Sequence, residues 1–358
     1  MQPRKLKLSS PVRGRIIAVS DIHGNLEYFK GILEKVGFSE NDTLVIIGDF
    51  TEKGAGGLKT LRHIMKLSET HNVITLCGNH DIWALLLDGE LESADESVID
   101  YMTRKPECLA REMCDDIGFA FSADCEYEPL RDMLLREFRA EFDFLRKMPT
   151  LLETEHYIFV HGGIPEDGGN AYAYLKYDDF MHCGRKFDKW IIVGHWPVML
   201  YHENIVNANP VFDYASKIIS IDGGCVLKDD GQLNALIIPY DGSEDFAFEA
   251  YCSFPKATAL SAQSASNTSY YIRWGDNEVQ VLKRGEEFCF CRHIRTGYEM
   301  DILTKYVYGD GEFCTVNDCT DYVLPVSAGD ELLIVETTSR GYFAKHKGIS
   351  GWYYGKIG

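Results

Sequence analysis

The side chains best suited to chemistry in this chain stand in short polar stretches that directly follow apolar runs. In the first of them, Asp21 and His23 lie two positions apart after the β-branched run 15–19. A carboxylate and an imidazole at a single strand end are most often ordinary turn residues. The pattern recurs at four further strand ends, however, and together these positions supply Asp21, His23, Asp49, Asn79, His80, His161 and His195.

The composition of this set points to bound metal. Carboxylate, amide and imidazole groups without thiolates suit Mn, Fe or Zn rather than a structural cysteine-type zinc site. A carboxylate shared by two ions holds them about 3.5–4 Å apart, which is the two-metal arrangement used for phosphoryl displacement. Such a pair lowers the pKa of a bridging water towards neutrality, so that no covalent nucleophile is required.

Strands and helices have to alternate to bring these residues to one edge. Apolar β-branched runs predict strands at 15–19, 43–47 and 72–76, and amphipathic patterns predict helices at 26–36 and 58–67 between them. This order is typical of an α/β sheet with parallel neighbours, in which ligands gather at the carboxyl ends of the strands. Further strands are predicted at 156–160, 190–193, 217–221 and 233–239.

A helical pattern replaces the strands from about residue 88 to residue 148. Its clearest stretch repeats Leu130, Leu134, Phe138 and Phe142 every four residues, which predicts an amphipathic helix. Two interpretations stay open for this insertion. It is either a packed helical segment with a solvated acidic face, or a cap that shapes access to the site.

Five motifs, taken in order and spacing, resemble those of the calcineurin-like metallophosphoesterases. They are Asp21-x-His23-Gly24, Gly48-Asp49, Gly78-Asn79-His80-Asp81, His161-Gly162-Gly163 and Gly194-His195. The resemblance covers about residues 13–240 and is closest to the phosphoprotein phosphatase branch, of the bacterial serine/threonine phosphatase type. That branch is similar in its motifs to the symmetrical diadenosine tetraphosphatases. The resemblance implies an α/β fold (an α+β sandwich) in which two mixed β-sheets pack together and are flanked by helices.

The resemblance also implies a role for each motif residue. Asp21, His23 and Asp49 would hold the first metal, with Asp49 bridging to the second. Asn79, His161 and His195 would complete the second metal site, and His80 would be the general acid that protonates the leaving oxygen. The implied cofactors are two divalent metal ions (Mn, Fe or Zn), with Mn expected in vitro.

The predicted phosphate clamp departs from the family pattern. Where the family has Gly-Asp-x-Val-Asp-Arg-Gly, residues 48–54 read Gly-Asp-Phe-Thr-Glu-Lys-Gly. Glu52 takes the place of an aspartate that orients the general acid. Lys53 replaces an arginine that grips the phosphate, and it keeps the charge but loses the bidentate fork. A second family arginine aligns best with Tyr177, and the alternatives are Lys176 and Arg185.

The C-terminal part of the chain has a different pattern from the predicted catalytic domain at 1–251. Residues 252–269 are small and polar, which predicts a linker. Beyond it, residues 270–358 read as all-β and contain an internal repeat, because 285–298 aligns with 329–342 without a gap. This region resembles a pair of SH3-like small barrels, and a single irregular β-domain is the alternative.

Charge and cysteine usage restrict the partners and the compartment. A net charge of −19 argues against a nucleic-acid-binding surface, because a broad acidic face cannot neutralise phosphates. No apolar run approaches the length of a membrane span, and the N-terminal residues lack a signal-peptide pattern. The eleven cysteines contain no CxxC pair, so we expect a cytoplasmic protein with reduced thiols.

These observations lead to a binuclear metal-dependent phosphoesterase as the leading hypothesis, acting on phosphomonoesters of serine/threonine phosphoproteins. A diadenosine tetraphosphatase-like nucleotide hydrolase is the alternative among enzymes, since Gly194-His195-Trp196 bears some likeness to that group. A binding or scaffold protein with a degenerate site is the alternative from another class. The expected partners are the phosphorylated protein or nucleotide, and a peptide or protein ligand of the C-terminal β region.

Overall fold

The computed structural model of the protein describes residues 2–8, 12–89 and 94–358. Residues 1 and 9–11 of the predicted catalytic domain, and residues 90–93 of the predicted helical insertion, lie outside the described residues. The chain divides into two compact units. Unit 1 comprises Met1–Pro197, Pro210–Leu227 and Gly231–Cys252, and unit 2 comprises Val198–Asn209, Lys228–Asp230 and Ser253–Gly358. Every predicted metal ligand belongs to unit 1.

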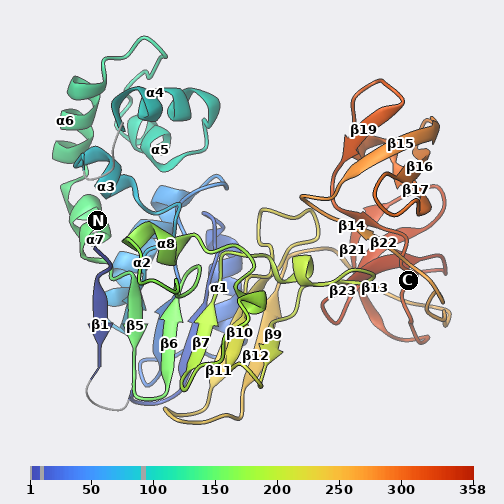
Figure 1. Cartoon of the computed structure of the whole chain (residues 1–358), viewed down its shortest axis with the longest axis horizontal. Helices are drawn as coiled ribbons and strands as arrows, with labels where there is room; N and C mark the ends of the chain where they lie inside the picture. Colours follow the sequence, from blue (N-terminus) through green and yellow to red (C-terminus); the bar gives the residue numbers. More distant parts are fainter. Residues whose placement is uncertain (1, 9–11, 90–93) are drawn as a thin grey trace. The chain divides into compact units, whose positions relative to one another are not determined.

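Two mixed β-sheets form the centre of unit 1 (Figure 1). The five-stranded sheet has the order β12 (Ala247–Tyr251), β11 (Leu233–Ile238), β2 (Ile16–Val19), β3 (Thr43–Ile46), β4 (Asn72–Thr75), and its β2, β3 and β4 are parallel. The six-stranded sheet has the order β1 (Lys5–Lys7), β5 (Leu151–Glu153), β6 (Tyr157–Val160), β7 (Trp190–Val193), β10 (Ile218–Ser220), β9 (Val211–Asp213). In this sheet β6, β7 and β10 run parallel.

Alternation of side chains along the strands creates the layers of unit 1. Ile16 and Ala18 of β2 face the other sheet and pack in one apolar cluster with Tyr157 and Phe159 of β6. The intervening Ile17 and Val19 face α1 (Leu26–Lys35) and α2 (Gly57–Ser68) in a second cluster. On the far side, α8 (Ala171–Leu175) and η1 (Phe180–His182) cover the six-stranded sheet. The predicted sandwich of two mixed sheets flanked by helices is therefore confirmed.

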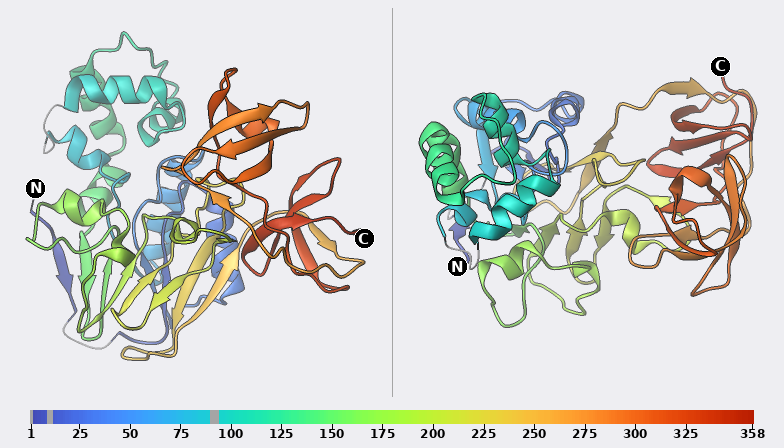
Figure 2. Two further views of the ribbon diagram at one scale, coloured as in Figure 1. Left: turned by 45° about the vertical axis from the view of Figure 1, so that its right-hand side comes forward. Right: turned by 90° about the horizontal axis from the view of Figure 1, so that it is seen from above.

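The helical segment after β4 consists of α3 (Trp83–Leu87), α4 (Ala94–Arg104), α5 (Leu109–Asp116), α6 (Tyr127–Glu137) and α7 (Arg139–Lys147). In Figure 1 and the left view of Figure 2 these helices, teal to green, gather above the sheets. The single helix expected through Leu130 and Phe142 is in fact two, because Phe138 leaves the helical conformation with φ −110° and ψ 35°. Its four apolar side chains are nevertheless all buried. Within the described residues, no helix combines the length and the apolar character needed to cross a membrane.

One contact shows how this insertion supports the loops near the predicted site. Glu112 of α5 accepts hydrogen bonds from the backbone N–H groups of Gly56 (2.6 Å), Gly57 (3.0 Å) and Leu58 (2.8 Å). These are the first N–H groups of α2, which have no partner inside the helix. A carboxylate from the insertion therefore caps the helix that follows the 48–54 motif.

Unit 2 is built from short antiparallel strands. One five-stranded sheet contains β17 (Glu299–Leu303), β16 (Phe288–His293), β15 (Glu278–Lys283), β19 (Phe313–Val316) and β18 (Val307–Tyr308). The other contains β13 (Lys256–Thr258), β21 (Glu331–Thr337), β22 (Tyr342–His346), β23 (Ile349–Tyr353) and β8 (Val206–Asn207), while β14 (Tyr271–Ile272) pairs with β20 (Cys319–Thr320). Two 3-10 turns, η2 (Val198–Tyr201) and η3 (Thr304–Tyr306), complete the unit. One apolar cluster gathers side chains of the first sheet together with Phe343 and Trp352 of the second, and another lies within the second sheet. The SH3-like detail stays a prediction.

The boundaries of unit 2 differ from those expected. The predicted linker contains β13, which pairs with β21, and Gln263, whose side-chain amide donates to the carbonyls of Leu324 (2.8 Å) and Trp352 (2.9 Å). Small polar residues occur in edge strands as well as in linkers, so composition alone does not distinguish the two. Residues 198–209 also belong to unit 2, since β8 pairs with β23.

Candidate metal centre

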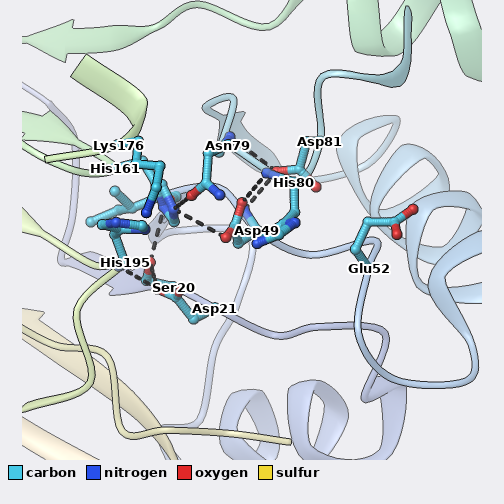
Figure 3. Close-up of polar contacts among 12 residues, drawn as sticks. Ser20, Asp21, Asp49, Glu52, Asn79, His80, Asp81, His161, Lys176 and His195 are labelled. Atoms are coloured by element: carbon cyan, nitrogen blue, oxygen red, sulfur yellow. Dashed lines mark hydrogen bonds and ion pairs between the residues drawn. The ribbon is translucent and has the colours of Figure 1, made fainter. Parts of the chain in front are cut away.

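The predicted ligands meet where the carboxyl ends of the strands of unit 1 converge. Asp21 follows β2, Asp49 follows β3, Asn79 follows β4, and His161 and His195 follow β6 and β7 (Figure 3). His23 lies two residues after Asp21 in the same loop. Two groups of three side chains have ligand atoms that all lie within 4.8 Å of one another. One is Asp21, His23 and Asp49, and the other is Asp49, His161 and His195. Asp49 is common to both, as a bridging carboxylate has to be.

The backbone at these ligands adopts a conformation that most residues avoid. Asp21, His23, Asp49 and His195 all have positive φ values, of 57°, 50°, 52° and 65°. Residues other than glycine enter the left-handed region rarely, and such strain concentrates at functional sites. Hydrogen bonds between the loops hold it in place, because Asp21 N–H donates to the Gly48 carbonyl (3.1 Å) and His23 N–H to the Asp49 carbonyl (3.0 Å).

Two glycines of the motifs allow the ligand loops to approach closely. A Cβ at Gly78 would lie 2.1 Å from Asp49 Oδ1, and a Cβ at Gly194 would lie 2.4 Å from Asp21 Oδ2. Any side chain at either position would therefore displace a predicted metal ligand. The motif glycines are thus required by packing against the carboxylates.

One ring nitrogen of each histidine bonds a group outside the predicted ligand set, and the other is left for a metal, although His161 Nε2 also bonds the predicted ligand Asn79 at its Oδ1 (3.1 Å). His23 Nδ1 bonds the Glu52 carbonyl (3.0 Å) and His161 Nδ1 bonds the Ile47 carbonyl (2.7 Å), so both expose Nε2 to the centre. His161 Nε2 lies 3.2 Å from Asp49 Oδ2. His195 has the opposite ring orientation, because its Nε2 bonds Asp178 Oδ1 (2.8 Å). Its Nδ1 is therefore the nitrogen left for a metal. A histidine held in this way by a second partner is typical of metal ligation.

The fit to divalent cations is tested by buried atoms that lack a partner. Asp21 Oδ1, His23 Nε2 and Asp222 Oδ2 have no hydrogen-bond partner among the described residues, although all three side chains are buried. The other oxygen of Asp21 is satisfied by Ser20 Oγ and by the His195 backbone N–H. Buried lone pairs without a donor are costly, and a cation would satisfy them. The residues present therefore fit a pair of divalent metal ions.

Electrostatics support the same conclusion. Burial, and then repulsion by neighbouring carboxylates, raises the pKa of Asp21 to about 7 and the pKa of Asp222 to about 8. Burial alone would also raise the pKa of Asp49, but the surrounding histidines, His161 first, hold it well below its usual range. Nearby positive charge stabilises ionised carboxylates, so bound cations would favour the charged forms of all three.

Comparison with known proteins identifies the family. Residues 14–215 match the family model described as Calcineurin-like phosphoesterase. The chain belongs to the calcineurin-like phosphoesterases. This confirms the predicted family and the predicted class of enzyme, a hydrolase of phosphate esters, and members of this family depend on two metal ions.

Two of the relatives are named as bis(5'-nucleosyl)-tetraphosphatases. A symmetrical bis(5'-nucleosyl)-tetraphosphatase of Wigglesworthia glossinidia brevipalpis is 39% identical over 79 residues, which is 22% of this chain and 28% of the relative. The asymmetrical bis(5'-nucleosyl)-tetraphosphatase PrpE of Oceanobacillus iheyensis is 23% identical over 240 residues, covering 59% of this chain and 84% of PrpE. The chain thus spans less than a third of the first relative and most of the second.

Solved structures of the family are more distant. A protein serine/threonine phosphatase from Saccharomyces cerevisiae aligns at 13% identity with a TM-score of 0.41, over 71% of this chain and 85% of that one. A metallophosphoesterase from Sphaerobacter thermophilus aligns at 16% identity with a TM-score of 0.38, over 66% and 88%.

His80 and Glu52, the two residues that we expected to act in proton transfer, are not paired in this phosphoesterase. The backbone N–H of His80 donates to Asp49 Oδ1 (2.8 Å), which keeps the ring beside the centre, and burial lowers the pKa of His80 to about 4. Glu52 instead accepts from the indole of Trp83, from the Leu109 backbone N–H (2.8 Å) and from the Tyr101 hydroxyl (2.9 Å). Figure 3 shows it apart from the ligand cluster. The expectation that Glu52 orients His80 is corrected, because helices α3 to α5 supply all three of these donors.

The predicted phosphate clamp is rearranged as well. The ring of Tyr177 packs against Phe180, with ring centroids 5.1 Å apart, and Arg185 stacks over Phe187 while it donates to the Ile164 carbonyl. Tyr177 packs against the apolar cluster that covers the six-stranded sheet, and Arg185 stacks over two rings of this cluster, so their expected place in the clamp is corrected. Lys176, the other alternative, lies near the ligands (Figure 3) and forms an ion pair with Asp178 (3.1 Å).

Lys53 belongs to the same motif loop as Asp49 and Glu52 and has a positive φ of 80°. It is half-buried, and its pKa is lowered, first by burial and then by the nearby charge of Lys105. Asp49 and Glu52 act on it in the opposite direction. Its charge in turn contributes to lowering the pKa of His80.

Three functional carboxylates were missed by sequence reasoning. Asp178 orients His195, and Asp222 faces Asp21 and His23 with an unpartnered oxygen. Asp81 accepts from the backbone N–H groups of Asp49 (2.6 Å), Phe50 (3.1 Å), Thr51 (3.2 Å) and Gly78 (3.0 Å), and from the Thr51 hydroxyl (2.8 Å). A signal existed for Asp222, because it follows a predicted strand and precedes Gly223-Gly224, as the ligands do. No signal marked Asp178, whose role depends on the loop before η1.

Proposed function

We propose that the protein is a two-metal phosphoesterase that hydrolyses phosphate esters by attack of water. The observation that carries this proposal is the sharing of Asp49 between two ligand groups, together with the buried, unpartnered atoms Asp21 Oδ1 and His23 Nε2. When bound, a pair of divalent ions supplies Lewis-acid charge for the phosphoryl oxygens and a water of lowered pKa. Mn is the ion that we would load first.

The residues of the chain then bind and orient the substrate. The side chains that we propose to hold the phosphoryl oxygens in the absence of the family arginines are Lys53 of the 48–54 motif and Lys176, which lies near the ligands in Figure 3. His80 lines the cavity beside the centre, and we propose it as the general acid that protonates the leaving oxygen. Because lysine lacks the paired donors of arginine, we expect weak ground-state binding, with a raised KM and a preserved kcat.

Two substrate classes follow from this chemistry. Serine/threonine phosphoproteins are the first class, because the motifs resemble those of serine/threonine phosphatases. Dinucleoside tetraphosphates are the second class, and the names of two curated relatives favour them. The alternative of a scaffold with a degenerate site is disfavoured by the complete ligand set.

The decisive experiment measures metal content and hydrolysis of p-nitrophenyl phosphate on one preparation reconstituted with Mn. Asp49→Asn should lose more metal than Asp21→Asn, because only Asp49 touches both ligand groups, and Asp132→Asn on the exposed face of α6 is the matched control. Fewer than about one metal per chain in the unmodified protein would exclude the two-metal site. Lys53→Arg should lower KM, and unchanged kinetics on every substrate would remove Lys53 from the clamp.

Two further expectations complete the proposal. All eleven cysteines are free, which agrees with the reducing, cytoplasmic environment that we propose. A peptide or protein ligand for unit 2 is also proposed. A cavity of about 420 Å³ there, lined by Phe290, Tyr298 and Tyr354 among others, is the place to look for it.

A further inference from the structure

A cavity of about 260 Å³ opens directly beside His80. His80 and Asn79 close one end of it, and the walls include Trp83 and Leu86 of α3 and Val98 and Tyr101 of α4. Ile82 adds to this apolar and aromatic lining, and Arg104 of α4 contributes a guanidinium group. The predicted helical insertion therefore supplies most of a compartment that begins at the proposed proton donor.

Buried hydrogen bonds hold the aromatic walls in place. The indole N–H of Trp83 and the hydroxyl of Tyr101 both donate to the carboxylate of Glu52, at 2.9 Å for Tyr101. The two ring centroids lie 5.6 Å apart with the planes inclined at 58°. Glu52 is 1% exposed, so this network is shielded from water. Glu52 thus accepts the hydrogen bonds of both polar groups, the Trp83 indole N–H and the Tyr101 hydroxyl. The apolar faces of the two rings are left to line the cavity.

The position of the cavity identifies which part of a substrate would enter it. His80 is proposed to protonate the leaving oxygen, so whatever is bonded to that oxygen lies on the His80 side of the centre. The side chain of serine or threonine is too small to cover these apolar walls. A cavity of this volume lies just below the roughly 300–1,000 Å³ of pockets for drug-sized ligands, and it therefore suits a single ring system.

We propose that this cavity is a leaving-group pocket that receives a flat aromatic ring. The proposal rests on the proposed phosphoesterase function and specifies its substrate class: phosphate esters whose leaving group carries an aromatic ring. Trp83 and Tyr101 bind the ring, and Glu52 is a positioning residue that fixes both walls. The ring has two sources in biology, a phenol bonded directly to the phosphate or a nucleobase at the end of a nucleotide.

The test compares substrates with and without the ring in the Mn-loaded full chain. Phenyl phosphate and diadenosine tetraphosphate represent the two sources of the ring, and ethyl phosphate lacks it. Tyr101→Ala removes one wall, Tyr101→Phe keeps the ring without its bond to Glu52, and Tyr240→Ala removes an exposed ring elsewhere in unit 1. For each variant, kcat/KM on an aromatic substrate is divided by kcat/KM on ethyl phosphate. This ratio removes any change in activity that affects both substrates equally.

We expect Tyr101→Ala to lower this ratio about tenfold through KM, the size of one aromatic contact. Tyr101→Phe should lower it less than threefold, and Tyr240→Ala should leave it unchanged. A selective loss with phenyl phosphate identifies an aryl phosphate substrate, and a selective loss with the dinucleotide identifies a nucleotide substrate. Equal losses on aromatic and ethyl substrates, or an unchanged ratio in Tyr101→Ala, would overturn the pocket.

A binding measurement separates this proposal from the proposed function. Phenylphosphonate and methylphosphonate are titrated calorimetrically into the Mn-loaded protein and into Tyr101→Ala. Tighter binding of phenylphosphonate that disappears in the variant supports the pocket even if no substrate is hydrolysed, in which case only the phosphoesterase function fails. Equal affinity for the two phosphonates in the unmodified protein would overturn the pocket independently of activity. Tyr101→Phe also controls for folding, since it retains the ring that fills this space.

Discussion

Replacing Asp81 by asparagine should destabilise the metal-free protein strongly, because this one carboxylate organises two ligand loops. One oxygen accepts from the backbone N–H groups of Asp49 and Gly78, and the other accepts from Phe50 and from the N–H and hydroxyl of Thr51. Asp81 is 1% exposed, so water does not replace a lost acceptor. Asparagine keeps only one acceptor oxygen and turns an NH₂ group towards the remaining donors.

The magnitude follows from counting the groups that lose their acceptor. With the amide oxygen in either orientation, two backbone N–H groups face the new NH₂ group: Asp49 and Gly78 in one case, Phe50 and Thr51 in the other. The Thr51 hydroxyl can rotate and is not counted. Each buried N–H left without a partner costs about 1–3 kcal/mol, so we expect a loss of about 2–6 kcal/mol in the free energy of unfolding.

The assay is urea denaturation in the presence of a chelator, because bound metal would stabilise the folded state by mass action and mask the effect. Asp132→Asn is the control, since this carboxylate is exposed and pairs with its neighbour Arg131; it should change the free energy by less than about 0.5 kcal/mol. A loss below about 1 kcal/mol for Asp81→Asn, with an unchanged denaturant slope, would refute the reasoning. It would mean that the loop N–H groups find other acceptors.

Three further predictions concern single side chains. His80→Asn should lower kcat about 10²–10⁴-fold with metal content intact, and more for ethyl phosphate than for p-nitrophenyl phosphate; equal losses would argue against a general acid. Asp178→Asn should weaken Mn binding about 10–100-fold in equilibrium dialysis, because the carboxylate orients His195, and unchanged affinity would show that this contact is dispensable. The Arg15 guanidinium holds the pKa of Asp42 below 3.8, so this ion pair stabilises the fold above that pH, and the stabilisation is lost as pH falls through the lower folded value. Asp42→Asn should therefore cost about 1 kcal/mol in thermal unfolding at pH 7 and almost nothing at about pH 2, whereas an equal cost at both would contradict the ion-pair argument.

The metal ligands could be predicted from the sequence because each one is local to a strand end. A β-branched run followed by a polar or glycine-containing stretch determines both the strand and the loop after it, as at Val19 and Asp21. Parallel strands then bring their carboxyl ends to the same edge, so ligands far apart in the chain meet without any further information. The family and the two-sheet sandwich depended on this same local pattern.

The surroundings of the metal centre were decided only by tertiary structure. Glu52 binds Trp83, Tyr101 and Leu109, which are 31, 49 and 57 positions away and lie on three helices whose packing no local pattern describes. Periodicity predicted that these helices exist, but it could not show that their aromatic rings would enclose a cavity beside His80.

The predictions of the phosphate clamp and of the unit boundary differ from the structure for a related reason. Tyr177 and Lys176 are adjacent in sequence, and the turn before η1 decides which of them faces the ligands. Residues 206–207 pair with a strand more than 140 positions later, so their membership of unit 2 depends on a non-local register. Local propensity thus determined the strands and the ligands at their ends. Contacts between distant segments determined what surrounds those ligands, because burial and hydrogen bonding depend on which segments pack together.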